Sequence, residues 1–327
     1  MTQFQIATPW RGFGKPLTPG GTIEDWKIEA GFTWTALMAP VLYEVQHEGQ
    51  ACDLEYEGKS VIFRDDNNFP LSIVSSRYKP MQPGEVLEFF RDLVSAYGSF
   101  QLETAGIIQG GRKIWALASA AGDAVVMPES DEEKIHRYLL LATSFDTSIP
   151  TVVQQTAIRF SCANALGMVF ARGAAGDEPQ IKVRHNTEFK TKAVQQKMSL
   201  DQQWTAFNAF IRKLVDYKLG ADPEGVAKRY FLDVFYPEAT RKLSTFSETH
   251  SQKRVSSLME IFRNAPGQQL VTAKDTAWGL VNAVTYYIDH VSRSKSPEAR
   301  LDKAWFGEGN KLKNRAASLA ADLAGIE

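Results

Sequence analysis

Positively charged residues lie beside aromatic residues at three places in the sequence. Arg112 and Lys113 come shortly before Trp115, and Arg159 directly precedes a phenylalanine. A third group gathers around Phe189 and consists of Lys182, Arg184, Lys190 and Lys192. A site for single-stranded nucleic acid needs cations along the phosphate track and flat rings on which bases stack. We therefore predict that these cations neutralise phosphates and that Trp115 or Phe189 stacks on bases or packs beneath the strand, although each residue taken singly also fits a surface charge or a core aromatic.

Cys162 is the residue that a thiol enzyme would use as its nucleophile. Ser161 is a plausible N-cap for a helix over residues 162–170, and a helix N-terminus favours the thiolate. A nucleophile also needs a base held by an orienting group, and none of the five histidines has a spacing that identifies it as this base. A buried structural cysteine is the simpler explanation for Cys162. We predict no catalytic residue.

Metal and nucleotide motifs are missing from the sequence. There is no His-x-x-x-His or Cys-x-x-Cys spacing of the kind that binds metal ions. The pairs Gly12/Gly14 and Gly307/Gly309 lack the complete pattern of a P-loop and the third glycine of a dinucleotide fingerprint. We therefore expect neither a metal site nor a cofactor.

Charge is distributed unevenly along the 327 residues. Residues 1–180 contain 14 Lys and Arg against 22 Asp and Glu, a balance of −8, and residues 181–327 contain 23 against 16, a balance of +7. Such asymmetry can indicate a half that binds polyanions, but long solvated helices rich in Lys and Arg are the simpler explanation. With two cysteines, no apolar run of about 20 residues and no basic, apolar leader, the sequence favours a cytoplasmic protein without a membrane segment.

Local signals predict an α+β fold with a curved antiparallel sheet and packed helices in the N-terminal half. Thr22 and Asp25 indicate a capping box for a helix over residues 23–30. Residues 33–46, 60–64 and 71–75 are rich in strand-forming types, and a helix over 83–97 follows. The Gly110-Gly111 pair predicts a hairpin between strands 100–107 and 112–118. Further extended segments are expected at 152–160 and 180–184.

After about residue 188 the strand signals disappear and helical periodicity dominates. Apolar residues recur at helical spacing over 204–214 and 277–291, and a last amphipathic helix is expected over 311–324. We therefore predict a domain boundary near residue 186, with an α+β domain over 1–186 and a helical region over 187–327.

Several segments together resemble a phage/plasmid-like protein family, which is catalogued as a domain of unknown function found on phages, prophages and plasmids. These segments are Thr8-Pro-Trp-Arg-Gly-Phe-Gly14, Leu71-Ser-Ile-Val-Ser-Ser-Arg-Tyr-Lys-Pro80, Gly110-Gly-Arg-Lys-Ile-Trp115, Leu139-Leu-Leu-Ala-Thr-Ser-Phe-Asp146, residues 158–166, Thr276-Ala-Trp278 and Asn282-Ala-Val-Thr285. Cys162-Ala-Asn164 and Ala165 depart from the family's more polar pattern. The resemblance implies a protein of a mobile element, encoded near replication or recombination genes, and its fold is similar to that of single-strand annealing proteins.

Three hypotheses follow for the function. The first is a non-enzymatic protein of DNA metabolism that binds single-stranded DNA and promotes strand annealing as a homo-oligomer. The second is a protein-interaction or anti-defence factor without a nucleic-acid site, in which the helical half presents an apolar patch to a partner. The third is a cysteine-based enzyme built on Cys162.

Overall fold

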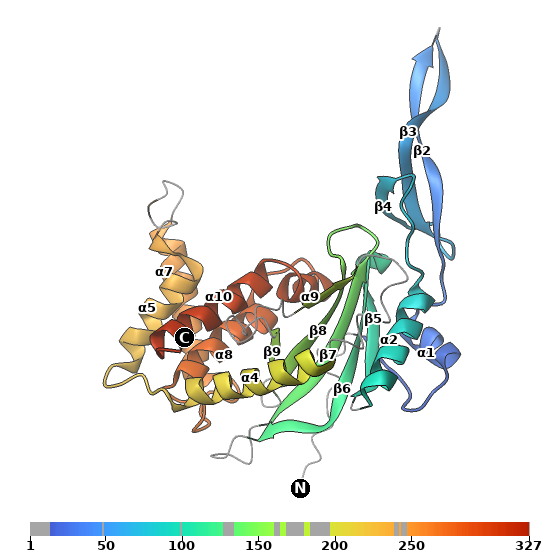
Figure 1. Ribbon diagram of the computed structural model, residues 1–327. Coiled ribbons are helices and arrows are strands. Elements are labelled where there is room, and N and C mark those ends of the chain that lie inside the picture. Colours follow the sequence, from blue (N-terminus) through green and yellow to red (C-terminus); the bar gives the residue numbers. More distant parts are fainter. Residues whose placement is uncertain are drawn as a thin grey trace. The chain divides into compact units, whose positions relative to one another are not determined.

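The computed structural model describes residues 14–47, 49–98, 100–126, 134–159, 164–167, 180–183, 197–238, 242 and 247–326. They form an α+β fold with two antiparallel sheets in the N-terminal half and mainly helices in the C-terminal half, as the sequence predicts (Figure 1). The chain divides into two compact units, one of residues 1–121, 139–153 and 181–197 and one of residues 122–138, 154–180 and 198–327. The boundary predicted after residue 186 lies outside the described residues.

The first helix, α1 (Ile23–Ala30), begins and ends where its sequence predicts. The Thr22 hydroxyl accepts a hydrogen bond from the Asp25 amide at 3.2 Å, and the Asp25 carboxylate accepts one from the Thr22 amide at 3.1 Å. Gly31 ends the helix in the left-handed conformation, with φ of 74°. The capping box thus satisfies amides that have no partner inside the helix.

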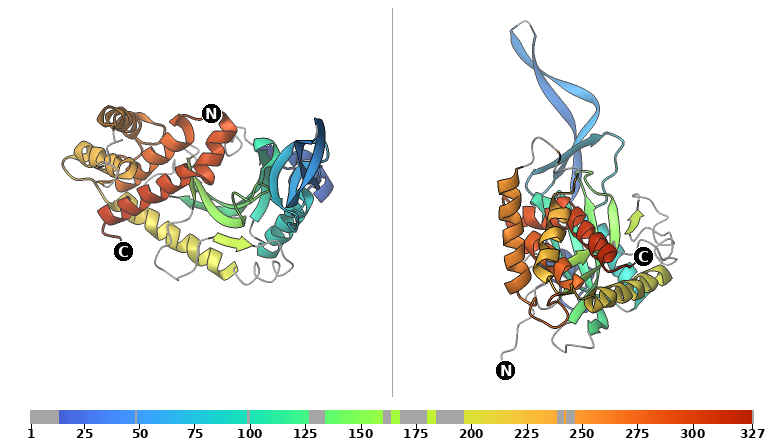
Figure 2. Two further views of the ribbon diagram at one scale, coloured as in Figure 1. Left: turned by 90° about the horizontal axis from the view of Figure 1, so that it is seen from above. Right: turned by 90° about the vertical axis from the view of Figure 1, so that its left-hand side faces the viewer.

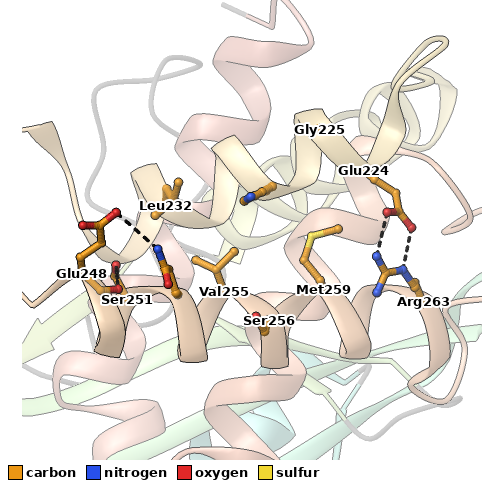
Figure 3. A pocket seen from close by; sticks show the side chains of 11 residues that line it. Glu224, Gly225, Leu232, Glu248, Ser251, Val255, Ser256, Met259 and Arg263 are labelled. Atoms are coloured by element: carbon orange, nitrogen blue, oxygen red, sulfur yellow. Dashed lines mark hydrogen bonds and ion pairs between the residues drawn. The ribbon is translucent and has the colours of Figure 1, made fainter.

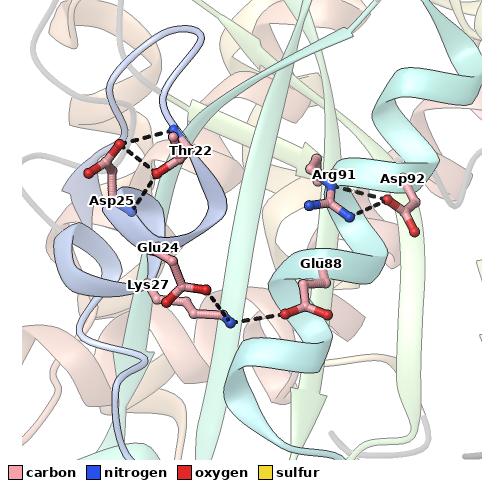
Figure 4. A network of polar contacts seen from close by, with 7 residues as sticks. All are labelled: Thr22, Glu24, Asp25, Lys27, Glu88, Arg91 and Asp92. Atoms are coloured by element: carbon pink, nitrogen blue, oxygen red, sulfur yellow. Dashed lines mark hydrogen bonds and ion pairs between the residues drawn. The ribbon is translucent and has the colours of Figure 1, made fainter.

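A lysine bridge connects α1 to α2 (Pro83–Tyr97), and Figure 4 shows it beside the capping box. The Lys27 ammonium lies 2.9 Å from a Glu88 carboxylate oxygen and 3.1 Å from one of Glu24. These hydrogen bonds, above all the one to Glu88, raise the pKa of Lys27. Helix α2 turns an apolar face inward, with Val86, Leu87 and Phe90 all buried.

The smaller sheet consists of β2 (Ala36–His47), β3 (Gln50–Arg64) and β4 (Pro70–Ser75) in the order β2-β3-β4. The register between β2 and β3 shifts after Pro40, where the sequence predicts a bend. β3 is longer than predicted, because residues 50–59 are also extended. β2 and β3 form a long twisted ribbon that extends away from α1 and α2 of the same unit (Figures 1 and 2).

The larger sheet has the order β1-β5-β6-β7-β8-β10, and β9 pairs with β8. Its strands are β1 (Lys15–Pro16), β5 (Phe100–Ile108), β6 (Lys113–Val126), β7 (Lys134–Ser144), β8 (Thr151–Arg159), β9 (Asn164–Gly167) and β10 (Gln180–Val183). The helix predicted over residues 162–170 is wrong for the residues described there. Asn164–Gly167 is a strand because β8 supplies an antiparallel partner, with Arg159 opposite Asn164 and Thr156 opposite Gly167.

Five further helices of the second unit accompany α8 (Ala277–Tyr286) in the described residues. They are α4 (Lys197–Asp216), α5 (Pro223–Phe235), α7 (Glu248–Asn264), α9 (Pro297–Trp305) and α10 (Glu308–Leu323). Residues 277–285 of α8 are all buried, and α5, α7, α10 and β9 contact this helix. The predicted apolar face of α4 is confirmed, since Trp204, Phe207, Ile211 and Leu214 are buried. No helix in the described part of the chain is both long and apolar enough to cross a membrane.

Candidate nucleic-acid interface

The turn between β5 and β6 is built from two glycines in backbone conformations that other residues rarely adopt. Gly110 has φ of 71° and Gly111 has φ of 106°. A Cβ atom on Gly110 would lie 2.7 Å from the Phe69 ring, and one on Gly111 would lie 3.0 Å from the Trp34 ring. The glycines therefore allow two aromatic rings to pack directly on the turn.

Two arginines lie on these rings, and one of them, Arg64, forms an ion pair in the described structure. Arg64 is 4.6 Å from the centre of the Trp34 ring, is buried, and pairs with Asp66 at 2.5 Å. The hydrogen bond from Arg64 lowers the pKa of Asp66. Arg112 is half-buried, 5.8 Å from the centre of the Phe69 ring, and no carboxylate in the described part of the chain lies within ion-pair distance of it. Arg112 is thus the guanidinium at this turn that remains available to an anion.

The neighbouring predicted residues Lys113 and Trp115 are core residues. Their side chains are 6% and 1% exposed, and the Trp115 ring fits against the backbone of Gly14 and Gly106. A ring so enclosed has no face on which a base could stack. Of the three residues predicted on this hairpin, only Arg112 reaches the surface.

The side chains of the remaining predicted site residues lie outside the part of the chain that the structure describes. Arg159 is the last residue of β8 and Lys182 is in β10, and their side chains lie outside the described residues. The same holds for the whole of Arg184, Phe189, Lys190 and Lys192, and for Cys162. Their proposed contacts with phosphates and bases stay predictions.

A second group of an arginine and aromatic rings lies in the second unit, and the sequence analysis did not find it. Arg254 of α7 lies 5.3 Å from the ring centres of both Phe235 and Tyr236, at the end of α5. Tyr287 packs edge-on against Phe235, with ring centres 5.6 Å apart. All four side chains are half-buried, and no described carboxylate is close enough to Arg254 for an ion pair. We call these four residues the Arg254 cluster.

The segment that carries Tyr287 is held in place by a buried ion pair. Residues Tyr287–Val291 form a π-helical turn that continues α8, a conformation that often occurs at functional sites. Asp289 in this turn lies 2.5 Å from the Lys313 ammonium of α10, and the two side chains are 8% and 2% exposed. Lys313 therefore fixes the position of the turn and of the Tyr287 ring beside it.

A groove of about 900 Å³ runs between α5 and α7 (Figure 3). Leu232, Val255 and Met259 give it an apolar floor. At one end Arg263 donates to both carboxylate oxygens of Glu224 at 2.6 and 2.7 Å, which lowers the pKa of Glu224. Glu248 lies at the other end. The charges along the groove largely cancel, so it is unlike a track for phosphates.

Other site chemistry is sparse in the part of the chain that the structure covers. No group of three or more His, Cys, Asp or Glu side chains is placed there to hold a metal ion.

A family model for a domain of unknown function (DUF932) matches residues 70–305. No curated protein and no solved structure matches the chain.

Proposed function

We propose that this chain, which belongs to the family described as a domain of unknown function (DUF932), is a non-enzymatic protein that binds single-stranded nucleic acid. The observation that carries the proposal is the Arg254 cluster, in which a guanidinium without a described carboxylate partner lies on two half-buried rings. Arg112 on Phe69 repeats this chemistry in the first unit.

The chemistry of these two places suits an unpaired strand. A guanidinium held flat on a ring keeps N–H donors for a phosphate and loses little conformational freedom when it binds one. Phe235 and Tyr236 are partly exposed, so a base can stack beside the arginine. The balance of +7 over residues 181–327 adds a general attraction for polyanions.

The finer parts of the proposal rest on the resemblance of the sequence segments to phage and plasmid proteins. We propose that the protein serves DNA metabolism of a mobile element in the cytoplasm of the host cell, and that it promotes annealing of complementary strands as an oligomer. A strand-annealing assay with complementary oligonucleotides tests this activity separately from binding.

Fluorescence anisotropy with a labelled oligothymidylate across a salt series tests binding. For wild type we expect affinity to fall with salt, with a log–log slope of about −0.7 for each neutralised phosphate. Arg254→Ala and Arg112→Ala should each weaken binding and make the slope shallower by about 0.7. Tyr236→Leu should weaken binding by about 1–3 kcal/mol if a base stacks on this ring.

Arg263→Ala is the matched control. It removes the same charge from α7, but from an arginine that is already paired with Glu224. It should leave the salt slope unchanged. Folded wild-type protein that does not bind the oligonucleotide at low salt, or equal losses in Arg254→Ala and Arg263→Ala, would overturn the proposal.

The groove between α5 and α7 supports a second candidate function, a protein-interaction factor. An apolar floor with charge-balanced walls is typical of surfaces that receive an amphipathic segment of another protein. Met259→Lys would abolish capture of one stoichiometric partner from host lysate, whereas Arg254→Ala would not. If the protein captures no partner, this candidate fails.

A further inference from the structure

The ribbon of β2 and β3 continues far beyond the sheet that supports it. β4 pairs with β3 only between Lys59 and Phe63, and β2 pairs with β3 alone in the described structure. Residues 41–47 and 49–57, which we call the arm, therefore form a two-stranded ribbon whose two edges are open in the described structure (Figure 2). An isolated two-stranded ribbon is at best marginally stable in water, so the arm is a candidate for a binding partner.

One face of the arm is apolar. Successive side chains of a strand point to opposite faces, and Tyr43 and Val45 of β2 lie opposite Leu54 and Cys52 of β3. Tyr43 is 47% exposed and Leu54 is 44% exposed. The register shift between Pro40 and Leu42 separates this face from the exposed apolar residues Leu37 and Ile73 at the base of the ribbon. Over residues 42–47 of β2 this stripe is about 20 Å long.

The other face of the arm is acidic. Glu44 lies opposite Asp53, and Leu42 lies opposite Glu55. Like charges that face each other across two strands repel. Water screens this repulsion and a buried interface does not, so we expect the acidic face to stay exposed to water. Residues 41–57 contain five acidic residues and no Lys or Arg. The arm therefore repels nucleic acid and anionic membranes.

We propose that the apolar face of the arm binds the same face of the arm in a second copy of this chain. Packing apolar face on apolar face covers the exposed Tyr43 and Leu54 side chains in both copies. It also leaves both acidic faces outward in water, so that the like charges never meet inside the interface. This pattern is complementary to itself, as a two-fold symmetric dimer requires. The inference does not depend on nucleic-acid binding.

The charge of the arm also gives the dimer a distinctive salt dependence. Two arms that each carry a charge of about −5 repel one another at long range, and salt screens that repulsion. The dimer should therefore tighten as salt rises. A basic protein bound to the acidic face would show the opposite dependence.

Sedimentation velocity of the full chain from about 1 to 100 µM tests the proposal, with two leucines as a matched pair. Leu54 and Leu42 are 44% and 58% exposed and lie on opposite faces of the same ribbon. We expect Leu54→Lys to raise the dimer dissociation constant at least tenfold, and Leu42→Lys to leave it unchanged or lower it. Both leucines are exposed, so each variant should keep the melting temperature of the wild-type protein, which would show that its folding is intact.

Cys52 supplies a second readout that does not depend on a variant. It is a free, exposed cysteine on the apolar face. Its alkylation by a maleimide, followed by mass mapping of its peptide, should slow as protein concentration rises. A wild-type protein that stays monomeric at 100 µM in both low and high salt, or equal effects of the two lysine variants, would overturn the proposal.

Discussion

Breaking the buried ion pair between Asp289 and Lys313 should destabilise the second unit strongly. The ammonium and carboxylate are 2.5 Å apart, and their side chains are 2% and 8% exposed. Removing one partner leaves a buried charge without compensation, which costs about 3–5 kcal/mol. For a unit of this size, about 2–4 °C per kcal/mol converts the loss into a melting temperature lower by roughly 6–20 °C. We expect this loss for both Asp289→Leu and Lys313→Met.

A double-mutant cycle distinguishes a buried pair from two independent contacts. Replacing both charges with apolar side chains, in Asp289→Leu with Lys313→Met, removes the unpaired charge and should recover most of the lost stability. Urea denaturation followed by tryptophan fluorescence measures all four proteins. Single variants that lose less than about 1 kcal/mol of unfolding free energy, or a double variant whose loss equals the sum of the single losses, would show that the two charges do not stabilise each other as a buried pair.

Three further predictions test the first unit by urea denaturation. Burial raises the pKa of Glu103, so the folded protein loses stability when this carboxyl group ionises as pH rises. Glu103→Gln removes the ionisable group and should therefore stabilise the protein at pH 7 and much less near pH 4. An equal gain in stability at both pH values would contradict this. Trp115→Ala should cost about 3–5 kcal/mol because the ring is 1% exposed, and a loss below 1 kcal/mol would show that the ring is not in the core. Thr22→Ala should cost about 0.5–2 kcal/mol and Thr22→Ser should restore most of it, unless the capping bond is absent.

Local chemistry explains which elements could be predicted from the sequence. The Thr22–Asp25 box, Pro83 and the Gly110-Gly111 pair each act within a few residues, and the helices and the hairpin that they predict are present. β9 was missed because a short apolar segment is extended only when another strand pairs with it, and β8 does so. The outer part of β3 was not predicted because neither of its faces is buried. The usual signal of a strand, an alternation of apolar and polar residues, is therefore weak there.

The candidate site was harder to predict because its residues come from separate elements. Phe235 and Arg254 lie on different helices, and nothing in their spacing along the chain indicates that they meet. On the hairpin, the position of Trp115 close to Arg112 and Lys113 in the sequence suggested a shared site. Side chains alternate along β6, however, and the backbone of Gly14 and Gly106 packs against the Trp115 ring, so Trp115 lies in the core. Arg112, at the turn itself, is the residue of the hairpin prediction whose side chain is half-buried rather than buried.

Ultraviolet crosslinking of the full chain to an oligothymidylate, with mass mapping of the modified peptides, tests whether an unpaired strand binds at the Arg254 cluster. We expect crosslinks on peptides that contain Phe235, Tyr236 or Tyr287, and their loss in Arg254→Ala but not in Arg263→Ala. Absence of any crosslink, or crosslinks that spare these three rings and persist in Arg254→Ala, would contradict this expectation.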